Sequence, residues 1–271
     1  MINLDVYCMA IEYFSILDKL PPYIKPLGLG NNIFPKHWLT EKEGENISDL
    51  NKNFAEATGF YWIWKNRLKN KNENDWVGSC QHRRFWLNDL YNKKQKVSYK
   101  SLYSNLLNPN NQIFSHCDTI QIQPTVLKKQ TVLQQFNKVY GKNIIEDCIN
   151  YLEKEDGIKF KNFLNGNELN ICNMFITKVH FFKSYCDSLF PWLNKCLEYC
   201  IKNNLCKDDN IRLPIFLAER YTSYWFAENT NCKYLSFARL GNFMLSNKIN
   251  KFINPTKIPF TFRMYPTIHD F

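Results

Sequence analysis

The chain has 271 residues, which allows one large or two small domains, and its 45% hydrophobic and 22% charged residues are typical of globular proteins, whereas its 16% aromatic content is high. No apolar run approaches the roughly 20 residues that a bilayer span needs, which argues against a membrane-spanning protein. The formal net charge of +10 favours anionic partners, namely nucleic acid, an anionic membrane leaflet or phosphate-bearing substrates, without choosing among them.

The N-terminus lacks the basic-then-apolar layout of a signal peptide. The ten cysteines include no Cys-x-x-Cys pair. Cys196 and Cys200 share a helix face at a spacing that favours neither a disulfide nor a metal clip. We therefore expect an intracellular protein whose thiols are reduced and serve as small hydrophobic side chains.

The first half of the chain begins with two short strands. The apolar residues 4–10 predict a buried strand, and residues 23–27 predict a second one between prolines and glycines. After a loop, the segment NFAEATGFYWIWKN is apolar on nearly every side of a helical wheel, which predicts a helix buried all round. Asn53 and Glu56 have the spacing of a capping box at its start, with the acid at the positive end of the helix dipole.

The segment DWVGSCQHRRFW predicts a strand over residues 76–80 that ends in a cluster of polar side chains. Farther on, the patterns predict strands at residues 117–124, 170–178 and 233–240. They also predict helices at residues 128–154, 180–203 and 211–229, and the long helix at 180–203 is expected to break or restart at its proline. Strands that alternate with helices indicate a layered α/β fold. We expect a single domain over residues 1–246 and a polar C-terminal tail over residues 247–271.

The polar cluster contains Arg83 and Arg84, two adjacent guanidiniums that suit a clamp for a diphosphate. Ligands of open α/β sheets bind beyond the carboxyl ends of strands, where this pair is expected. The alternative is a pair of surface salt bridges. His82 beside them either orients a phosphate or hydroxyl or is an ordinary structural histidine.

Glu219 stands among apolar neighbours in a predicted helix, where burial would raise its pKa and suit a general base. Periodicity alone favours an ion pair with Arg220 or a lysine instead. Asn173, next to a strand-like stretch, would point into a cleft, but an isolated Asn carries little weight. Cys80 with His82 resembles a thiol nucleophile with its base, yet no third group to orient them is visible, so we discount this pair.

Several familiar motifs are missing. The sequence has no GxxxxGK[ST], no GxGxxG and no Asp-x-Asp, and Asp208 with Asp209 is the nearest acidic pair. A hard cation such as Mg²⁺ or Mn²⁺ requires clustered carboxylates. We therefore expect no required cofactor and no metal site, with a divalent cation left open.

Taken together, GENIS, NFAEATGFYWIWKN, DWVGSCQHRRFW, NMFI and LAER, in this order and spacing, closely resemble a bacterial family of capsule and O-antigen glycosyltransferases. That family was long catalogued as a domain of unknown function, and some members are similar to galactofuranosyltransferases. The resemblance covers residues 4–240. It implies a GT-A-like, Rossmann-related α/β fold with a central mixed sheet flanked by helices.

The resemblance also implies a function. The expected enzyme is an inverting hexosyltransferase that uses a nucleoside-diphosphate sugar, a UDP-sugar first of all. Its acceptor would be a growing capsular or lipopolysaccharide glycan, or a lipid-linked glycan. Such an enzyme would be cytoplasmic, with room for peripheral contact with the anionic inner face of the cell membrane.

The site residues follow from matching motifs. The matches expected to act in catalysis are Glu219, Arg83 and Arg84, and those expected to bind substrate are Asn46, Ser48, Glu56, Trp62, Lys65, His82, Asn173 and Arg220. The sequence departs from the family pattern with Glu45 for Asp, Lys52 for Pro, Ala55 for Cys, and Gln81-His82 for His-Tyr. The histidine is shifted by one position, which on a strand would turn its side chain to the other face.

The residues and the resemblance together predict how the sugar would be transferred. A departing nucleoside diphosphate develops negative charge, which the arginines would stabilise in place of part or all of a metal's charge. Glu219 is the first choice for the base that deprotonates the acceptor, and Glu56 the second. The alternatives are a nucleic-acid-binding module and a catalytically inactive glycan-binding relative. The clustering of aromatic residues in one buried helix disfavours the nucleic-acid module.

Overall fold

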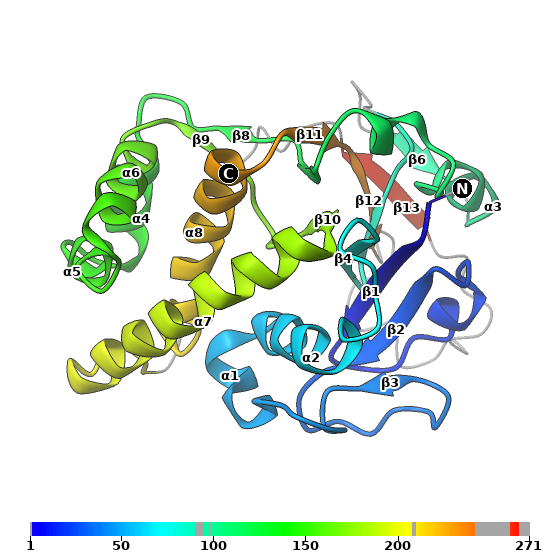
Figure 1. Cartoon of the computed structure of the whole chain (residues 1–271), viewed down its shortest axis with the longest axis horizontal. Helices are drawn as coiled ribbons and strands as arrows, with labels where there is room; N and C mark the ends of the chain where they lie inside the picture. Colours follow the sequence, from blue (N-terminus) through cyan, green and yellow to red (C-terminus); the bar gives the residue numbers. More distant parts are fainter. Residues whose placement is uncertain (1, 90–94, 98, 208–209, 242–260, 266–271) are drawn as a thin grey trace, which may run out of the picture.

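The computed structural model of the chain describes residues 2–89, 95–97, 99–207, 210–241 and 261–265. A mixed β-sheet runs through the middle and helices flank it (Figure 1), which confirms the predicted α/β fold class. No helix in these ranges is long and apolar enough to cross a membrane.

Four parallel strands form one half of the sheet, in the order β3-β2-β1-β4. Their bounds are Leu39–Thr40, Ile24–Gly28, Leu4–Ala10 and Trp76–Gln81. Every residue of β1 is buried, as expected for a parallel strand covered on both faces. The strands predicted at residues 4–10, 23–27 and 76–80 are therefore confirmed to within one residue.

The other half of the sheet contains an antiparallel strand. β10 (Phe175–Lys178) pairs antiparallel with both β4 and β7 (Thr119–Ile122), and β11 (Cys232–Leu235) pairs parallel with β7. Because β10 runs the other way, its first residue lies at the same edge as the last residues of β1, β4 and β7. The residues that follow β1, β4 and β7 and the residues that precede β10 therefore lie at the same edge of the sheet.

A second branch leaves this sheet at the end of β4. A tight turn leads into β5 (Arg84–Trp86), which pairs antiparallel with β12 (Phe237–Gly241). The branch continues through β13 (Thr261–Tyr265) to β6 (Gln95–Val97). β13 lies within the expected C-terminal tail, and the rest of the tail is outside the described residues.

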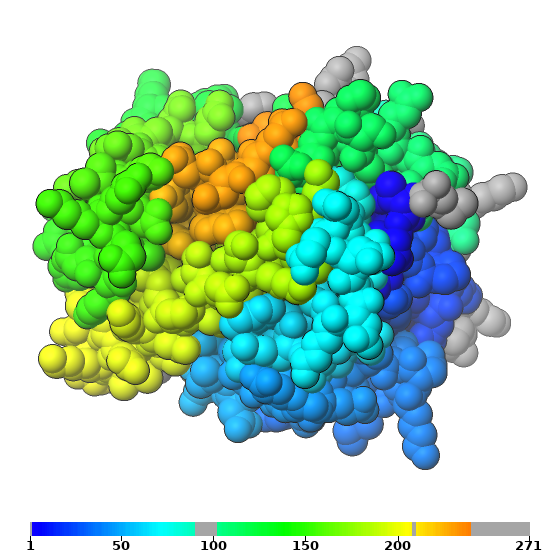
Figure 2. Space-filling model, in the orientation of Figure 1, coloured from blue at the N-terminus to red at the C-terminus, as the bar shows by residue number. Residues whose placement is uncertain are grey.

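The remaining elements lie around and beside the sheet (Figure 1). The helices are α1 (Asn51–Phe54), α2 (Ala57–Arg67), α3 (Tyr99–Asn105), α4 (Val132–Tyr140), α5 (Ile144–Ile149), α6 (Lys154–Leu164), α7 (Val179–Lys202) and α8 (Leu213–Asn229). Short 3-10 turns occupy Ser15–Lys19, Ser48–Leu50 and Gln112–Ser115, and β8 (Thr125–Val126) pairs with β9 (Glu168–Leu169). In Figure 2 the yellow-green surface of α7 lies between the blue-to-cyan surface of α2 and the orange surface of α8.

Two apolar clusters lie on the two faces of the sheet. Tyr7 and Met9 of β1 pack into the cluster that contains α2, α7 and α8. Val6 and Cys8 pack into the opposite cluster. This alternation is what the two-residue period of a strand requires. All ten cysteines are free, and seven of them are buried.

The aromatic helix begins differently from the prediction. Ala55, at φ 43°, separates α1 from α2, so the segment is two helices. The capping box is wrong, because Asn53 lies inside α1 and its side chain donates to the carbonyl of Ile211 at 2.9 Å. Glu56 precedes α2 and makes no capping hydrogen bond with its side chain. Its carboxylate is therefore available for another partner.

Other boundaries also moved. α7 continues through Pro191, so the predicted break is wrong. The strand predicted over residues 170–178 starts only at Phe175, because Cys172 and Asn173 have φ of 78° and 46°. The helix predicted over residues 128–154 is α4, α5 and the start of α6, and the last predicted strand is β11 and β12.

A buried acid near β2 gives a testable pH effect. Glu41 is fully buried and accepts the Gly30 N–H at 2.6 Å. Burial raises the pKa of Glu41 above its ordinary value of 4.5, so the folded chain binds more protons than the unfolded chain from pH 4.5 up through that raised pKa. The contribution of Glu41 to the free energy of unfolding is fully present below pH 4.5, and it is lost as the pH rises from 4.5 through the raised pKa.

Glu41→Gln removes this titration. We expect urea unfolding to show the stability of Glu41→Gln relative to wild type improving from pH 4.5 to pH 8. The matched control is Glu43→Gln, because Glu43 is exposed on the same loop. A difference between Glu41→Gln and wild type that stays constant with pH would contradict the expectation.

Candidate functional site

The carboxyl edge of the sheet carries two adjoining pockets. The parallel order β3-β2-β1-β4 is that of a doubly wound sheet, whose ligands bind outside the carboxyl ends of the strands where the order reverses. One pocket lies beyond the ends of β1 and β4, and we call it the switch-point pocket. The other lies between β5, β12, α4 and α8, and we call it the arginine pocket.

The switch-point pocket has a volume of about 150 Å³. Met9 and Leu29 supply apolar walls, and Glu56, Gln81, His82 and Arg212 supply polar ones. The His82 ring stacks on Phe14 with centroids 4.9 Å apart. Burial, followed by the charge of neighbouring Arg83, lowers the pKa of His82, which favours the neutral imidazole at physiological pH.

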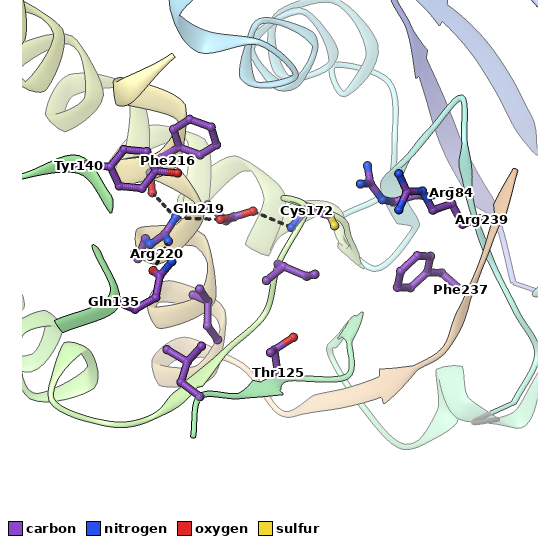
Figure 3. A pocket seen from close by; sticks show the side chains of 13 residues that line it. Arg84, Thr125, Gln135, Tyr140, Cys172, Phe216, Glu219, Arg220, Phe237 and Arg239 are labelled. Carbon is purple, nitrogen blue, oxygen red and sulfur yellow. Dashed lines mark hydrogen bonds and ion pairs between the residues drawn. The ribbon is translucent and has the colours of Figure 1, made fainter. Parts of the chain in front are cut away.

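The arginine pocket is larger, at about 310 Å³, which is within the range of small-molecule sites. Arg84 and Arg239 line one side, and Glu219 and Arg220 line the other (Figure 3). Half-buried aromatic rings of Tyr140 and Phe216 lie beyond the Glu219 side, and Leu127, Leu169, Ile171 and Phe237 add apolar side chains to the lining.

Arg84 and Arg239 face each other across β5 and β12, where they are register partners. Their side chains lie together at one end of the pocket in Figure 3. Arg84 donates from Nη1 to Gln81 Oε1, and its Nε is buried without a hydrogen bond among the described residues. Within those residues neither arginine forms an ion pair. Two guanidiniums held together in this way repel each other, and an anion between them would relieve the repulsion.

A strained turn separates the two pockets. Cys172 and Asn173 both adopt the left-handed conformation, which costs on the order of 1–3 kcal/mol per residue when the side chain is not Gly. Glu219 Oε1 accepts the Cys172 N–H at 2.7 Å, and Thr222 Oγ1 donates to Asn173 Oδ1 at 3.1 Å. Gln81 Nε2 donates to the Cys172 carbonyl at 2.8 Å. Helix α8 and the end of β4 thus hold the turn between them.

Glu56 lies on the switch-point side of this turn. Its Oε1 accepts from Asn173 Nδ2 at 2.9 Å. Burial raises the pKa of Glu56, and the hydrogen bond from Asn173 opposes this shift. From the other pocket, the negative charge of Glu219 raises the pKa of Glu56 and the positive charge of Arg84 lowers it. The two candidate bases therefore stand on opposite sides of Asn173.

Glu219 lies on the arginine-pocket side. Its Oε2 is 2.8 Å from Arg220 Nη1, so the ion pair that periodicity favoured is present. Arg220 also donates to the Phe216 carbonyl and, at 2.7 Å, to Gln135 Oε1. The carboxylate is oriented by two donors and still lines the pocket, so the ion pair and a role in the site are compatible.

Other predicted site residues lie elsewhere. Arg83 is exposed, lies 3.4 Å from Glu12 and lines neither pocket. This is the surface salt bridge that was the alternative for it. Cys80 is buried in the core, and burial raises the pKa of its thiol, which disfavours a nucleophile.

The four residues from the GENIS loop and the aromatic helix also line neither pocket. Asn46 Oδ1 accepts the Ser48 hydroxyl at 2.8 Å, and the Trp62 indole donates to the Glu43 carbonyl at 2.5 Å. Lys65 Nζ lies 3.3 Å from the centroid of the Trp64 ring. Of these contacts, the one from Trp62 fastens the loop over residues 43–48 to α2.

Several lining residues were missed by the sequence interpretation, namely Arg239, Arg212, Gln135, Tyr140 and Phe216. Arg239 had the best available signal, as the only arginine in a predicted strand. Nothing local indicated that its strand pairs with the one that carries Arg84.

Among the described residues, no three His, Cys, Asp or Glu side chains are placed to hold a metal ion. Asp208 and Asp209 lie outside those residues. Asp118 pairs with Lys178 at 2.6 Å and precedes β7, at the opposite edge from the pockets.

The fold and family were compared with known proteins. Residues 7–230 match the family described as Domain of unknown function (DUF4422). Among solved structures, the chain is similar to the apo structure of WbbM, a bifunctional glycosyltransferase, with a TM-score of 0.66 and 18% identity. The alignment covers 87% of this chain and 45% of that one, so this chain spans less than half of the larger protein. The comparison with curated proteins gave no match.

Proposed function

The chain belongs to the family described as Domain of unknown function (DUF4422), and we propose that it is a glycosyltransferase. The donor is a nucleoside-diphosphate sugar, with a UDP-sugar as the first candidate, and the acceptor is a growing capsular or lipopolysaccharide glycan. The observation that carries this proposal is the arginine pair facing a carboxylate across a pocket that adjoins the switch-point pocket. The fold shared with part of a glycosyltransferase supports it.

The two pockets divide the donor between them. The nucleoside binds in the switch-point pocket against Met9 and Leu29, which is where doubly wound sheets bind nucleotides. Gln81 lines this pocket and also bonds to Arg84, so it lies between the two pockets. The diphosphate then extends toward Arg84 and Arg239, and the sugar reaches the turn at Asn173. Glu56 assists by orienting that Asn173 side chain.

The arginine pair stabilises the leaving group. When the glycosidic bond breaks, the departing diphosphate gains negative charge, and preorganised donors aimed at that charge lower the barrier. A guanidinium offers a planar fork that matches phosphate oxygens. Arg84 lines the pocket with its Nε lacking a hydrogen-bond partner among the described residues, and Arg239 brings an exposed guanidinium from the neighbouring strand.

Glu219 is the general base of an inverting transfer. It faces the arginine pair across the pocket, so an acceptor hydroxyl beside it would attack the sugar from the side opposite the diphosphate. Its bonds to Cys172 and Arg220 fix the direction of the carboxylate. The protein would act in the cytoplasm, and its net charge of +10 suits peripheral contact with an anionic membrane.

Since arginines provide the positive charge, we expect UDP-sugar turnover to survive EDTA. Less than a twofold fall after chelation and desalting is the expected result in a UDP-release assay. Complete loss that Mn²⁺ reverses would contradict this, and would direct attention to Asp208 and Asp209.

A thermal-shift panel of UDP- and GDP-sugars tests the proposed function. A ligand at 100 times its Kd stabilises the folded state by about 2.7 kcal/mol, which raises the midpoint of a domain of this size by several degrees. We expect at least one UDP-sugar, and UDP itself, to give such a shift. Heparin or DNA that shifts the midpoint only below about 0.2 M salt would report net charge alone. No shift with any nucleotide would count against the proposal.

A further inference from the structure

One end of the arginine pocket is lined by two aromatic rings, Tyr140 and Phe216, which lie on the side of Glu219 away from the two arginines proposed to bind the donor diphosphate. We propose that Tyr140, Phe216, Gln135 and Glu219 form the acceptor subsite, which takes the terminal pyranose ring of the acceptor glycan. This inference rests on the proposed function and adds to it the place and chemical class of the acceptor.

The platform consists of two stacked rings. Tyr140 at the end of α4 and Phe216 in the first turns of α8 have centroids 4.8 Å apart and planes inclined by 23°. Both side chains are half-buried and line the pocket. A pyranose ring presents a face of C–H groups with slight positive charge, which packs on the negative face of an aromatic ring. Stacked aromatics left part-exposed beside polar groups thus suit a sugar ring.

Polar groups beside the platform can read hydroxyls. Gln135 Oε1 accepts from Arg220 Nη2, which fixes the amide and leaves its Nε2 without an acceptor among the described residues. Arg220 is only 3% exposed, and its own Nε has no hydrogen-bond partner in the described part of the chain. Glu219 adds a carboxylate that accepts a hydroxyl proton. Apolar walls with a few fixed polar groups are typical of ligand sites.

The position favours the acceptor over the donor. In Figure 3, Glu219 lies between the aromatic pair and the two arginines. A diphosphate at Arg84 and Arg239 places the donor sugar on the near side of Glu219. A ring on Tyr140 and Phe216 is then on the far side, with a hydroxyl within reach of the base. Transfer would move that hydroxyl proton to Glu219 while its oxygen forms the new glycosidic bond and UDP departs.

The probes are methyl α- and β-glycosides of glucose, galactose, mannose and rhamnose, studied by saturation-transfer NMR with the full chain and saturating UDP. We expect wild type to transfer saturation to the ring protons of at least one glycoside. Tyr140→Ala and Phe216→Ala should each weaken that binding about tenfold, equivalent to 1.4 kcal/mol. Tyr140→Phe should retain it, because the ring remains. The matched control is Tyr151→Ala, since Tyr151 is an exposed aromatic outside both pockets.

The results separate this inference from the proposed function. UDP affinity measured in the same samples should change less than twofold in the alanine variants, and circular dichroism should be unchanged. Weaker UDP-sugar binding with unchanged glycoside binding would assign the platform to the donor sugar and overturn the inference. Wild type that binds UDP but none of the glycosides would also overturn it while leaving the proposed function intact. Wild type that does not bind UDP would instead count against the proposed function.

Discussion

Arg84→Ala and Arg239→Ala should each slow turnover of the donor by about 10²–10³-fold, with the fold intact by circular dichroism. The reason is that each removes a preorganised donor aimed at developing charge, an effect worth about 2.7–4 kcal/mol in comparable sites. The two residues lie on adjacent strands and act on the same group, so the double variant should lose less than the sum of the two free energies. Steady-state UDP release over a range of donor concentrations measures both kcat and kcat/KM.

The chain supplies its own control for this prediction. Arg83 neighbours Arg84 in sequence, carries the same charge and is bound to Glu12 outside both pockets. Arg83→Ala should therefore cost less than threefold. Arg84→Lys and Arg239→Lys should restore only part of the activity, because a point charge lacks the planar fork. Full activity in both Arg84→Ala and Arg239→Ala would remove the pair from the mechanism.

Glu219→Gln should abolish transfer while donor binding is kept, since Gln preserves the shape of the side chain and removes the proton acceptor. A general base typically contributes about 10²–10⁴-fold. The variant also breaks the ion pair with the buried Arg220, which should lower the free energy of unfolding by roughly 1–3 kcal/mol. Urea unfolding and UDP affinity must therefore be measured beside the transfer rate, so that a folded, donor-binding and inactive variant can be identified.

Glu56→Gln is the comparison that decides between the two acids. Gln at position 56 still accepts from Asn173 Nδ2, so donor affinity and transfer should fall less than tenfold. A folded, inactive Glu56→Gln beside an active Glu219→Gln would reverse the assignment and make Glu56 the base. The structure allows this comparison because the two acids stand on opposite sides of the same turn.

The sequence predicted the buried framework well. Uninterrupted apolar runs such as residues 4–10 identify strands covered on both faces, because few alternatives bury so many side chains in a row. The order of strands and helices then indicated the α/β class. The polar cluster that directly follows an apolar strand predicted a site at the end of β4, and Arg84 lines a pocket there.

What failed depends on contacts between distant segments. Asn53 and Glu56 have the spacing of a capping box, but no box forms, because the Asn53 side chain bonds to the Ile211 carbonyl instead. The turn at Cys172 has no glycine to reveal it, and it exists because α8 supplies Glu219 and Thr222 as partners. The place of Arg239 in the pocket depends on the pairing of β12 with β5. Such features are fixed by tertiary pairing, which a local pattern does not encode.

The central claim is that this edge of the sheet breaks the glycosidic bond of a nucleoside-diphosphate sugar. Its most direct test is release of UDP from a panel of UDP-hexoses by the purified full chain, without acceptor and with the methyl glycosides. We predict slow hydrolysis of one donor by wild type, acceleration by an accepted glycoside, and loss of both in Arg84→Ala and Glu219→Gln. Release of no UDP from any donor by a folded chain that binds UDP would contradict the account and indicate a catalytically inactive relative.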